Sequence, residues 1–64
     1  MVIKYDKKSD IIYIQFSDKK VVESDEDKPG VILDYGEDGE IVGIEVLNAS
    51  KKTNQPNGIS YEVA

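Results

Sequence analysis

The large apolar side chains of this sequence are almost all β-branched, and this feature constrains the fold more than any other. Of its 18 Ile, Val, Leu and Phe residues, 15 are Ile or Val and two are Leu. β-Branched side chains are restricted at χ1 and fit a pleated sheet better than a helix. These 18 residues in a chain of 64 also exceed the roughly 20% level below which disorder is expected. The composition therefore predicts a folded, β-rich chain.

Short apolar segments separated by polar turns indicate an antiparallel sheet. The predicted strands are Val2–Tyr5, Ile11–Phe16, Val21–Ser24, Val31–Tyr35 and Glu40–Leu47. Clusters of Gly, Pro, Asp and Ser between such segments are the usual turns of a β-meander. We predict one all-β domain over residues 1–64, a small antiparallel meander of about five strands. Residues 53–64 end in the alternating segment 59–63, which could form a sixth C-terminal strand or remain a tail.

The apolar pattern also predicts strand register. A four-residue loop at Gly36–Gly39 would place Leu33 opposite Val42, and a loop at Asp6–Ser9 would place Ile3 opposite Ile12. The apolar pattern does not determine the register of segment 21–24. One face should then carry the core, which we expect to comprise Ile12, Ile14, Phe16, Val31, Leu33, Val42, Ile44 and Val46. Gly43, inside a strand, predicts a bulge or a close backbone approach.

The opposite face is not cleanly polar, and this predicts self-association. The candidate residues of an interaction surface on that face are Ile11, Tyr13, Ile32, Ile41 and Leu47. A 64-residue chain buries only about 60% of the surface that its unfolded form exposes. With no Cys and no His, disulfides are excluded and a zinc site is very unfavourable, so a second subunit is the remaining stabiliser. We predict a homodimer.

The charge balance argues against two classes of partner. The net charge is −5, with 13 Asp or Glu, eight Lys and no Arg. An acidic surface repels phosphate backbones and anionic lipid, and arginine is the usual reader of guanine and phosphate. We therefore expect no binding to nucleic acid by this chain alone and none to membranes. No apolar run approaches 18 residues, which predicts a cytoplasmic protein.

Several runs of the sequence resemble a known family. They are Tyr5-Asp6, the segment 10–14, Pro29–Asp34, Glu37–Gly39, the segment 41–47 and Ala49-Ser50. Together these runs are similar to the small bacterial and archaeal family called domain of unknown function 2283, over roughly residues 1–52. The resemblance implies a compact β-rich domain without an established activity. Because some relatives are encoded beside small toxin-like proteins, it also implies that an antitoxin-like role is conceivable.

Candidate sites for chemistry all have simpler structural explanations. Asp34, Asp38, Gly39 and Glu45 match places of a calcium-binding EF-hand loop. Gly36 cannot supply the ligand at the third place, and the flanks are strands rather than helices, so we predict a hairpin turn and no metal site. The acidic run 24–27 could chelate a cation or meet a basic protein, but it is typical of a solvated, mobile loop, here ending at Gly30.

Catalysis has no support in the sequence. Without His there is no usual base to activate a nucleophile, and we identify neither catalytic residues nor a cofactor. The leading hypothesis is a non-enzymatic, self-associating protein-interaction module, with a basic protein as a second partner. The alternative is a small cation- or ligand-binding protein that uses the acidic turns. Nothing in the sequence names the partner or the biological role.

Overall fold

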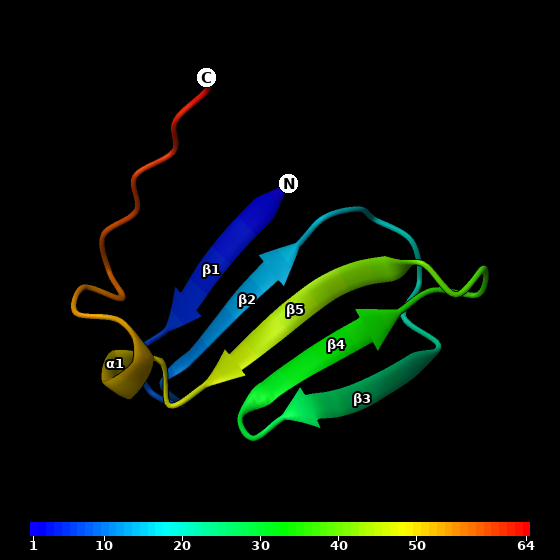
Figure 1. The fold of residues 1–64 in the computed structure, drawn as a ribbon, viewed down its shortest axis with the longest axis horizontal. Helices are drawn as coiled ribbons and strands as arrows, with labels where there is room; N and C mark the ends of the chain where they lie inside the picture. Colours follow the sequence, from blue (N-terminus) through cyan, green and yellow to red (C-terminus); the bar gives the residue numbers. More distant parts are fainter.

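The chain forms one antiparallel sheet followed by a single helical turn and an extended C-terminal segment (Figure 1). The computed structural model describes residues 1–64. Its elements are β1 (Val2–Asp6), β2 (Ile11–Gln15), β3 (Glu23–Lys28), β4 (Val31–Tyr35), β5 (Ile41–Leu47) and α1 (Ala49–Lys52). The predicted all-β class with five strands is confirmed. No helix is long and apolar enough to cross a membrane.

The strands lie in the order β1-β2-β5-β4-β3, so β5 rather than β3 is the neighbour of β2. The connection from β2 to β3 passes the ends of β5 and β4, as Figure 1 shows. Its backbone is bound at both ends, by the Phe16 amide to the Val42 carbonyl (2.7 Å) and by the Val22 amide to the Tyr35 carbonyl (2.9 Å). Strands β2 to β5 therefore form a Greek-key arrangement, with β1 and β3 as the two edges.

The β4–β5 hairpin differs from its predicted register by two residues. Its loop has five residues, because Tyr35 pairs with Ile41 rather than Glu40. A β-bulge at Val42 then adds a second residue, so that Leu33 faces Ile44 instead of Val42. The predicted pairs are wrong. Because side chains alternate between the two faces of a strand, a displacement of two residues still places apolar residues opposite apolar residues. The amide of Glu40 is bound by the Asp38 carboxylate (3.1 Å), which shapes the longer loop.

The first hairpin shows the same two-residue displacement. Ile3 pairs with Ile14 and Tyr5 with Ile12, whereas the sequence predicted Ile3 opposite Ile12. The reason is that Asp10 adopts a left-handed conformation with φ 58° and belongs to the turn. The Asp6 carboxylate accepts hydrogen bonds from two amides of this turn, so strand β1 extends to Asp6.

The acidic run predicted as a mobile loop is the edge strand β3. It pairs with β4 from Glu23 to Lys28, and all six of its residues are exposed. An edge strand needs only one hydrogen-bonded neighbour, and its charges face water and oppose pairing with other chains. The loop shrinks to Pro29-Gly30, where Gly30 has φ 80°, the conformation that a type II turn requires after proline. The Glu26 carboxylate accepts the Gly30 amide (2.8 Å).

Helix α1 is attached to the sheet through Asp10. The Asp10 carboxylate accepts hydrogen bonds from the Ser50 amide (3.0 Å), the Ser50 hydroxyl (2.7 Å) and the Tyr5 hydroxyl (2.7 Å). The Asp10 carbonyl accepts the Ala49 amide (3.0 Å), and Ala49 is completely buried. These bonds satisfy amides that a helix N-terminus leaves free, although Asp10 is 40 residues away in the sequence.

Very little of the chain is buried. Only four of 64 residues are buried, and the apolar ones are Val42 and Ala49. Most of the predicted core is therefore only half-buried, and Phe16 is 45% exposed. The prediction of a buried core is wrong for the single chain, because one sheet layer has nothing packed against it.

The C-terminal segment does not form a sixth strand. After Pro56 it turns at Gly58, whose amide binds the Gln55 carbonyl (3.1 Å), and then leaves the sheet. Ile59, Tyr61 and Val63 are 62%, 74% and 84% exposed. Figure 1 shows this segment rising past β1 into open space.

Candidate functional site

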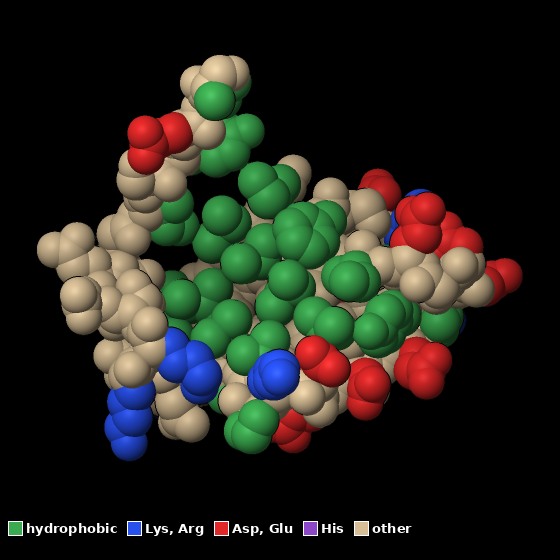
Figure 2. Space-filling model, in the orientation of Figure 1, with side chains coloured by type: hydrophobic (Ala, Val, Ile, Leu, Met, Phe, Trp, Pro, Cys, Tyr) green, Lys and Arg blue, Asp and Glu red, His purple; other side chains and the backbone are tan.

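The largest candidate site is one complete face of the sheet. Directly opposite residues of antiparallel strands share a face, and the pairs Ile3–Ile14, Ile14–Ile44 and Ile44–Leu33 run across four strands. Figure 2 shows hydrophobic side chains gathered on this side, with acidic groups along the β3 border. We call it the apolar face; it comprises Ile3, Tyr5, Ile12, Ile14, Val31, Leu33, Tyr35, Ile41, Ile44 and Val46, and Phe16 continues it.

The uncovered sheet and the extended C-terminal segment together give the chain a large total surface. The accessible area is 5077 Å² for 7.1 kDa, whereas a compact monomer of this mass exposes about 4,100 Å². The radius of gyration is 12.3 Å, against about 10.7 Å for a compact domain of this length. The excess of about 1,000 Å² is comparable to the roughly 800 Å² that each partner buries in a standard interface. The chain therefore exposes about as much extra surface as a stable dimer covers.

The other face, which we call the mixed face, holds four of the five predicted interaction residues. Ile11 pairs with Leu47, and Glu45 lies between Tyr13 and Ile32 on the neighbouring strands. Ile41 pairs with Tyr35 and so belongs to the apolar face, because the bulge reverses its side. The mixed face is defined by Val2, Lys4, Ile11, Tyr13, Gln15, Ile32, Asp34, Gly43, Glu45 and Leu47.

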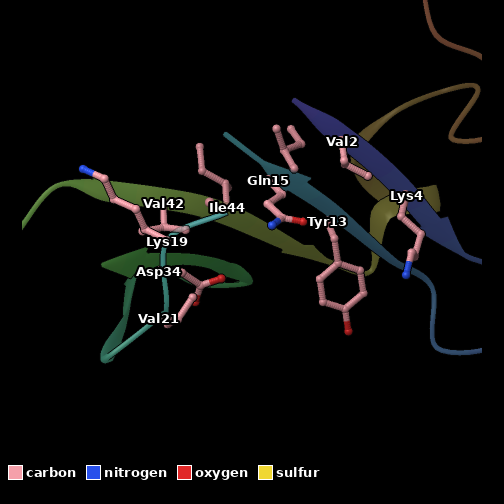
Figure 3. Close-up of a pocket in the computed structure, with 11 residues that line it drawn as sticks. Val2, Lys4, Tyr13, Gln15, Lys19, Val21, Asp34, Val42 and Ile44 are labelled. Carbon is pink, nitrogen blue, oxygen red and sulfur yellow. The ribbon is translucent and has the colours of Figure 1, made fainter. Parts of the chain in front are cut away.

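A pocket of about 270 Å³ lies on the mixed face, where the β2–β3 connection covers part of the sheet. Among its lining residues are Lys4, Tyr13, Lys19 and Asp34. In Figure 3 the Tyr13 ring and the Asp34 carboxylate project to the same side of the sheet, whereas Ile44 projects to the other. The Lys19 ammonium is engaged by Asp38 and Glu40, so the pocket offers the Lys4 ammonium and the Asp34 carboxylate.

Two carboxyl groups meet beside this pocket. Burial and, secondarily, the neighbouring Asp34 raise the pKa of Glu45 above its ordinary value of 4.5. The Ser24 hydroxyl donates a hydrogen bond to the Asp34 carboxylate (2.7 Å), which holds that carboxylate on the mixed face. Two like charges at close range disfavour ionisation of one of them. The pair therefore makes the centre of this face more polar than the strand pattern predicted.

The acidic loop between β4 and β5 is occupied by an internal ion pair. The Lys19 ammonium lies 2.9 Å from the Asp38 carboxylate and 3.5 Å from that of Glu40. The hydrogen bond with Lys19 lowers the pKa of Asp38, and Asp38 in turn raises the pKa of Lys19. No group of three or more acidic residues in the structure is placed to hold a metal ion. Asp34 and Glu45 belong to strands and lie outside the loop.

Comparisons with known proteins identify a sequence family. The family described as "Protein of unknown function (DUF2283)" matches residues 2–50. A protein of Methanosarcina mazei named "Putative hypoxanthine phosphoribosyltransferase" is 46% identical over 50 residues, which are 78% of this chain. This chain spans 40% of the length of that protein. No solved structure matches the chain.

Proposed function

Since the chain belongs to the DUF2283 family of proteins of unknown function, we propose that it is a non-enzymatic protein-interaction module that works as a homodimer through its apolar face. The observation that carries this proposal is the uncovered face itself. A one-layer sheet with ten paired apolar-face residues and almost no buried side chain lacks a second layer, and two-layer packing is the usual way to bury such a face. A second copy supplies that layer.

A second copy suits the apolar face better than water or a polar partner does. A two-fold axis lets one patch serve both chains, so every apolar residue finds an apolar counterpart. Two sheets stacked in this way are separated by about 10 Å, the thickness of a β-sandwich core. Glu23 and Asp25 of β3, which pair with Tyr35 and Leu33 and so share this face, would then lie at the edge of the interface. The mixed face, with its Asp34–Glu45 pair, is a poorer candidate because stacking would bury carboxylates.

The longer relative is consistent with a module that can be joined to other sequence. Its name refers to a hypoxanthine phosphoribosyltransferase, and this chain matches only part of it. We infer that the matched part contributes association rather than transfer chemistry. The support is the residue content, because this chain has no His, Cys or Arg and its pocket pairs no nucleophile with a base.

A basic protein is the second partner that we propose, in keeping with an antitoxin-like role. The support is the edge strand β3, where Glu23, Asp25, Glu26 and Asp27 are all exposed along one border. Complementary charge steers association and weakens as salt rises. A pull-down from the native host at low and high salt would identify such a partner; failure to retain a basic protein at low salt would remove this part of the proposal. The cytoplasmic location stays a prediction.

Light scattering at micromolar concentration tests the homodimer. We expect about twice the 7.1 kDa chain mass, and a denaturation midpoint that rises with protein concentration, because dissociation and unfolding are linked. A mass of one chain, with a midpoint that does not change on dilution, would refute the proposal. The same experiment with added calcium separates the alternative of a cation-binding protein, which predicts a specific rise in melting temperature.

A further inference from the structure

We propose that residues 59–63 form an exchanged arm, which adds to the free edge of strand β1 in a second copy of the chain. This inference rests on the proposed homodimer and names a second contact within it. The arm alternates in sequence, with Ile59, Tyr61 and Val63 on one side and Ser60 and Glu62 on the other. Such alternation suits a strand with one apolar side, although these residues make no backbone hydrogen bond in the single chain.

The arm is held at its base and free at its end. Residues Thr53 to Ile59 border a pocket of about 240 Å³ together with Ile3, Tyr5, Ile12 and Ile14 of the apolar face. The turn at Gly58 then directs the chain off that face. In Figure 1 the arm runs past β1, beyond the edge of its own sheet. The most exposed large side chains, Tyr61 and Val63, are therefore the ones that reach past the arm's own sheet.

The two sheet edges differ in their suitability as a docking site. Strand β3 presents Glu23, Asp25, Glu26 and Asp27, which would repel Glu62 of an arriving arm. Strand β1 presents Val2, Ile3 and Tyr5 together with Lys4 and Asp6, so its edge offers apolar contacts and no net charge. Both the arm and β1 are five residues long, about 17 Å when extended. The difference in charge therefore favours the β1 edge, and the length of β1 matches that of the arm.

Symmetry makes the exchange geometrically consistent. A two-fold axis that lies between the stacked sheets and crosses the strands places the two β1 edges on the same side of the dimer. Each arm, which leaves its chain beside β1 (Figure 1), can then reach the β1 edge of the other copy. Docking by strand addition to an exposed edge is a common mode of peptide recognition. The same edge left bare would be open to uncontrolled pairing.

Cross-linking between two single-cysteine variants tests the exchange, because the native chain has no cysteine. A tagged Ser60→Cys chain is mixed with an untagged Lys4→Cys chain, and a short bis-maleimide reagent is added. We expect a product that contains one chain of each kind. The matched control replaces Lys4→Cys with Asp25→Cys on the opposite edge, which should give no such product. Equal products from both edges would overturn the inference.

A second measurement guards against variants that misfold. Tyr61 and Val63 are 74% and 84% exposed in the single chain, so Tyr61→Ser with Val63→Ser should leave its circular dichroism unchanged. We expect the dissociation constant of the dimer to rise at least about tenfold, and Asn54→Ser in the same segment to leave it unchanged. A dimer with unaltered affinity and no cross-link to β1 would overturn the exchanged arm while the proposed function stands. A chain that is monomeric throughout would overturn both.

Discussion

Asp10 connects three parts of the chain through one side chain, and no local pattern reveals it. The sequence around Asp10 is typical of a turn, and the residue does occupy the turn with φ 58°. Its carboxylate reaches Tyr5 because of the β1–β2 hairpin, and Ser50 in α1 because the β2–β5 pairing brings the end of β5 near. Hydrogen bonds from Ser50 and Tyr5 lower the pKa of Asp10, and the bond to Asp10 raises the pKa of Tyr5.

Replacement of Asp10 should release α1. We expect Asp10→Ala to lower the melting temperature by several degrees, because it removes the helix-capping acceptor and the acceptor for Tyr5. Asp27→Ala, at an exposed site without such bonds, is the control and should change little. Since the pKa of Asp10 is lower in the folded chain, its contribution is complete above pH 3.8 and is lost as the pH falls further. In thermal melts from pH 7 to pH 2, the melting temperature of Asp10→Ala should converge with that of the native chain. Equal melting temperatures of these two chains at pH 7 would show that Asp10 does not stabilise the attachment of α1.

The ionised Glu45 carboxylate should destabilise the folded chain at neutral pH, whereas that of Asp10 stabilises it. Burial beside Asp34 raises the pKa of Glu45 in the folded chain, so its ionisation opposes folding at neutral pH. We expect Glu45→Gln to increase the free energy of unfolding at pH 7, by less than about 1 kcal/mol because the side chain is partly solvated. The gain should disappear below about pH 4.5, where the carboxyl is protonated in both states. Denaturant titrations at pH 7 and pH 3.5 measure the difference, and a gain that persists at pH 3.5 would argue against an electrostatic origin.

Strand β5 shows which parts of an element can be predicted from its sequence. Its existence and its apolar alternation follow from β-branched residues at period two, and the glycine at position 43 predicts the bulge or close approach that the structure contains. The register of β5 against β4 cannot be predicted from the sequence of the strand. The sequence allows a four-residue loop, whereas the Asp38 carboxylate and Lys19 stabilise a longer one. Lys19 arrives from a connection whose path depends on the whole sheet, so no local pattern contains this information.

Gly43 is the position in β5 where a side chain cannot fit. A Cβ atom there would lie 2.7 Å from the Ile14 carbonyl oxygen of β2, which is shorter than any relaxed contact. We expect Gly43→Ala to reduce the free energy of unfolding by about 1–3 kcal/mol, as overpacking in a rigid site usually does. Gly39→Asn is the control, because nothing lies within 4 Å of that position and asparagine tolerates its positive φ. Urea unfolding compares the two; equal losses would show that backbone freedom, rather than the contact with β2, requires glycine at position 43.

At the scale of the whole molecule, the two faces of the sheet could be predicted from the sequence, but the covering of each face could not. The β-branched composition and the spacing of the turns correctly predict a small antiparallel sheet. From the strand pattern we expect the face of Leu33 and Ile44 to be the interior, and the face of Ile11 and Ile32 to mediate association. A two-layer core needs a second element to cover the sheet, and α1 is only four residues long. The strand pattern shows which residues share a face, but not which face is covered.

Neighbouring residues of strand β4 can decide between the two faces. Leu33 lies on the apolar face and Ile32 on the mixed face, and both are half-buried in the single chain. Threonine at either site suits a strand because it is β-branched, and it removes apolar contact, so each variant should lose a similar amount of monomer stability, about 1–3 kcal/mol. If the apolar face is the interface, Leu33→Thr should in addition weaken the dimer by on the order of tenfold or more, whereas Ile32→Thr should not. Sedimentation equilibrium over a range of concentrations measures both constants. Selective dissociation by Ile32→Thr would instead place the interface on Ile11, Tyr13, Ile32 and Leu47, where the sequence alone had predicted it.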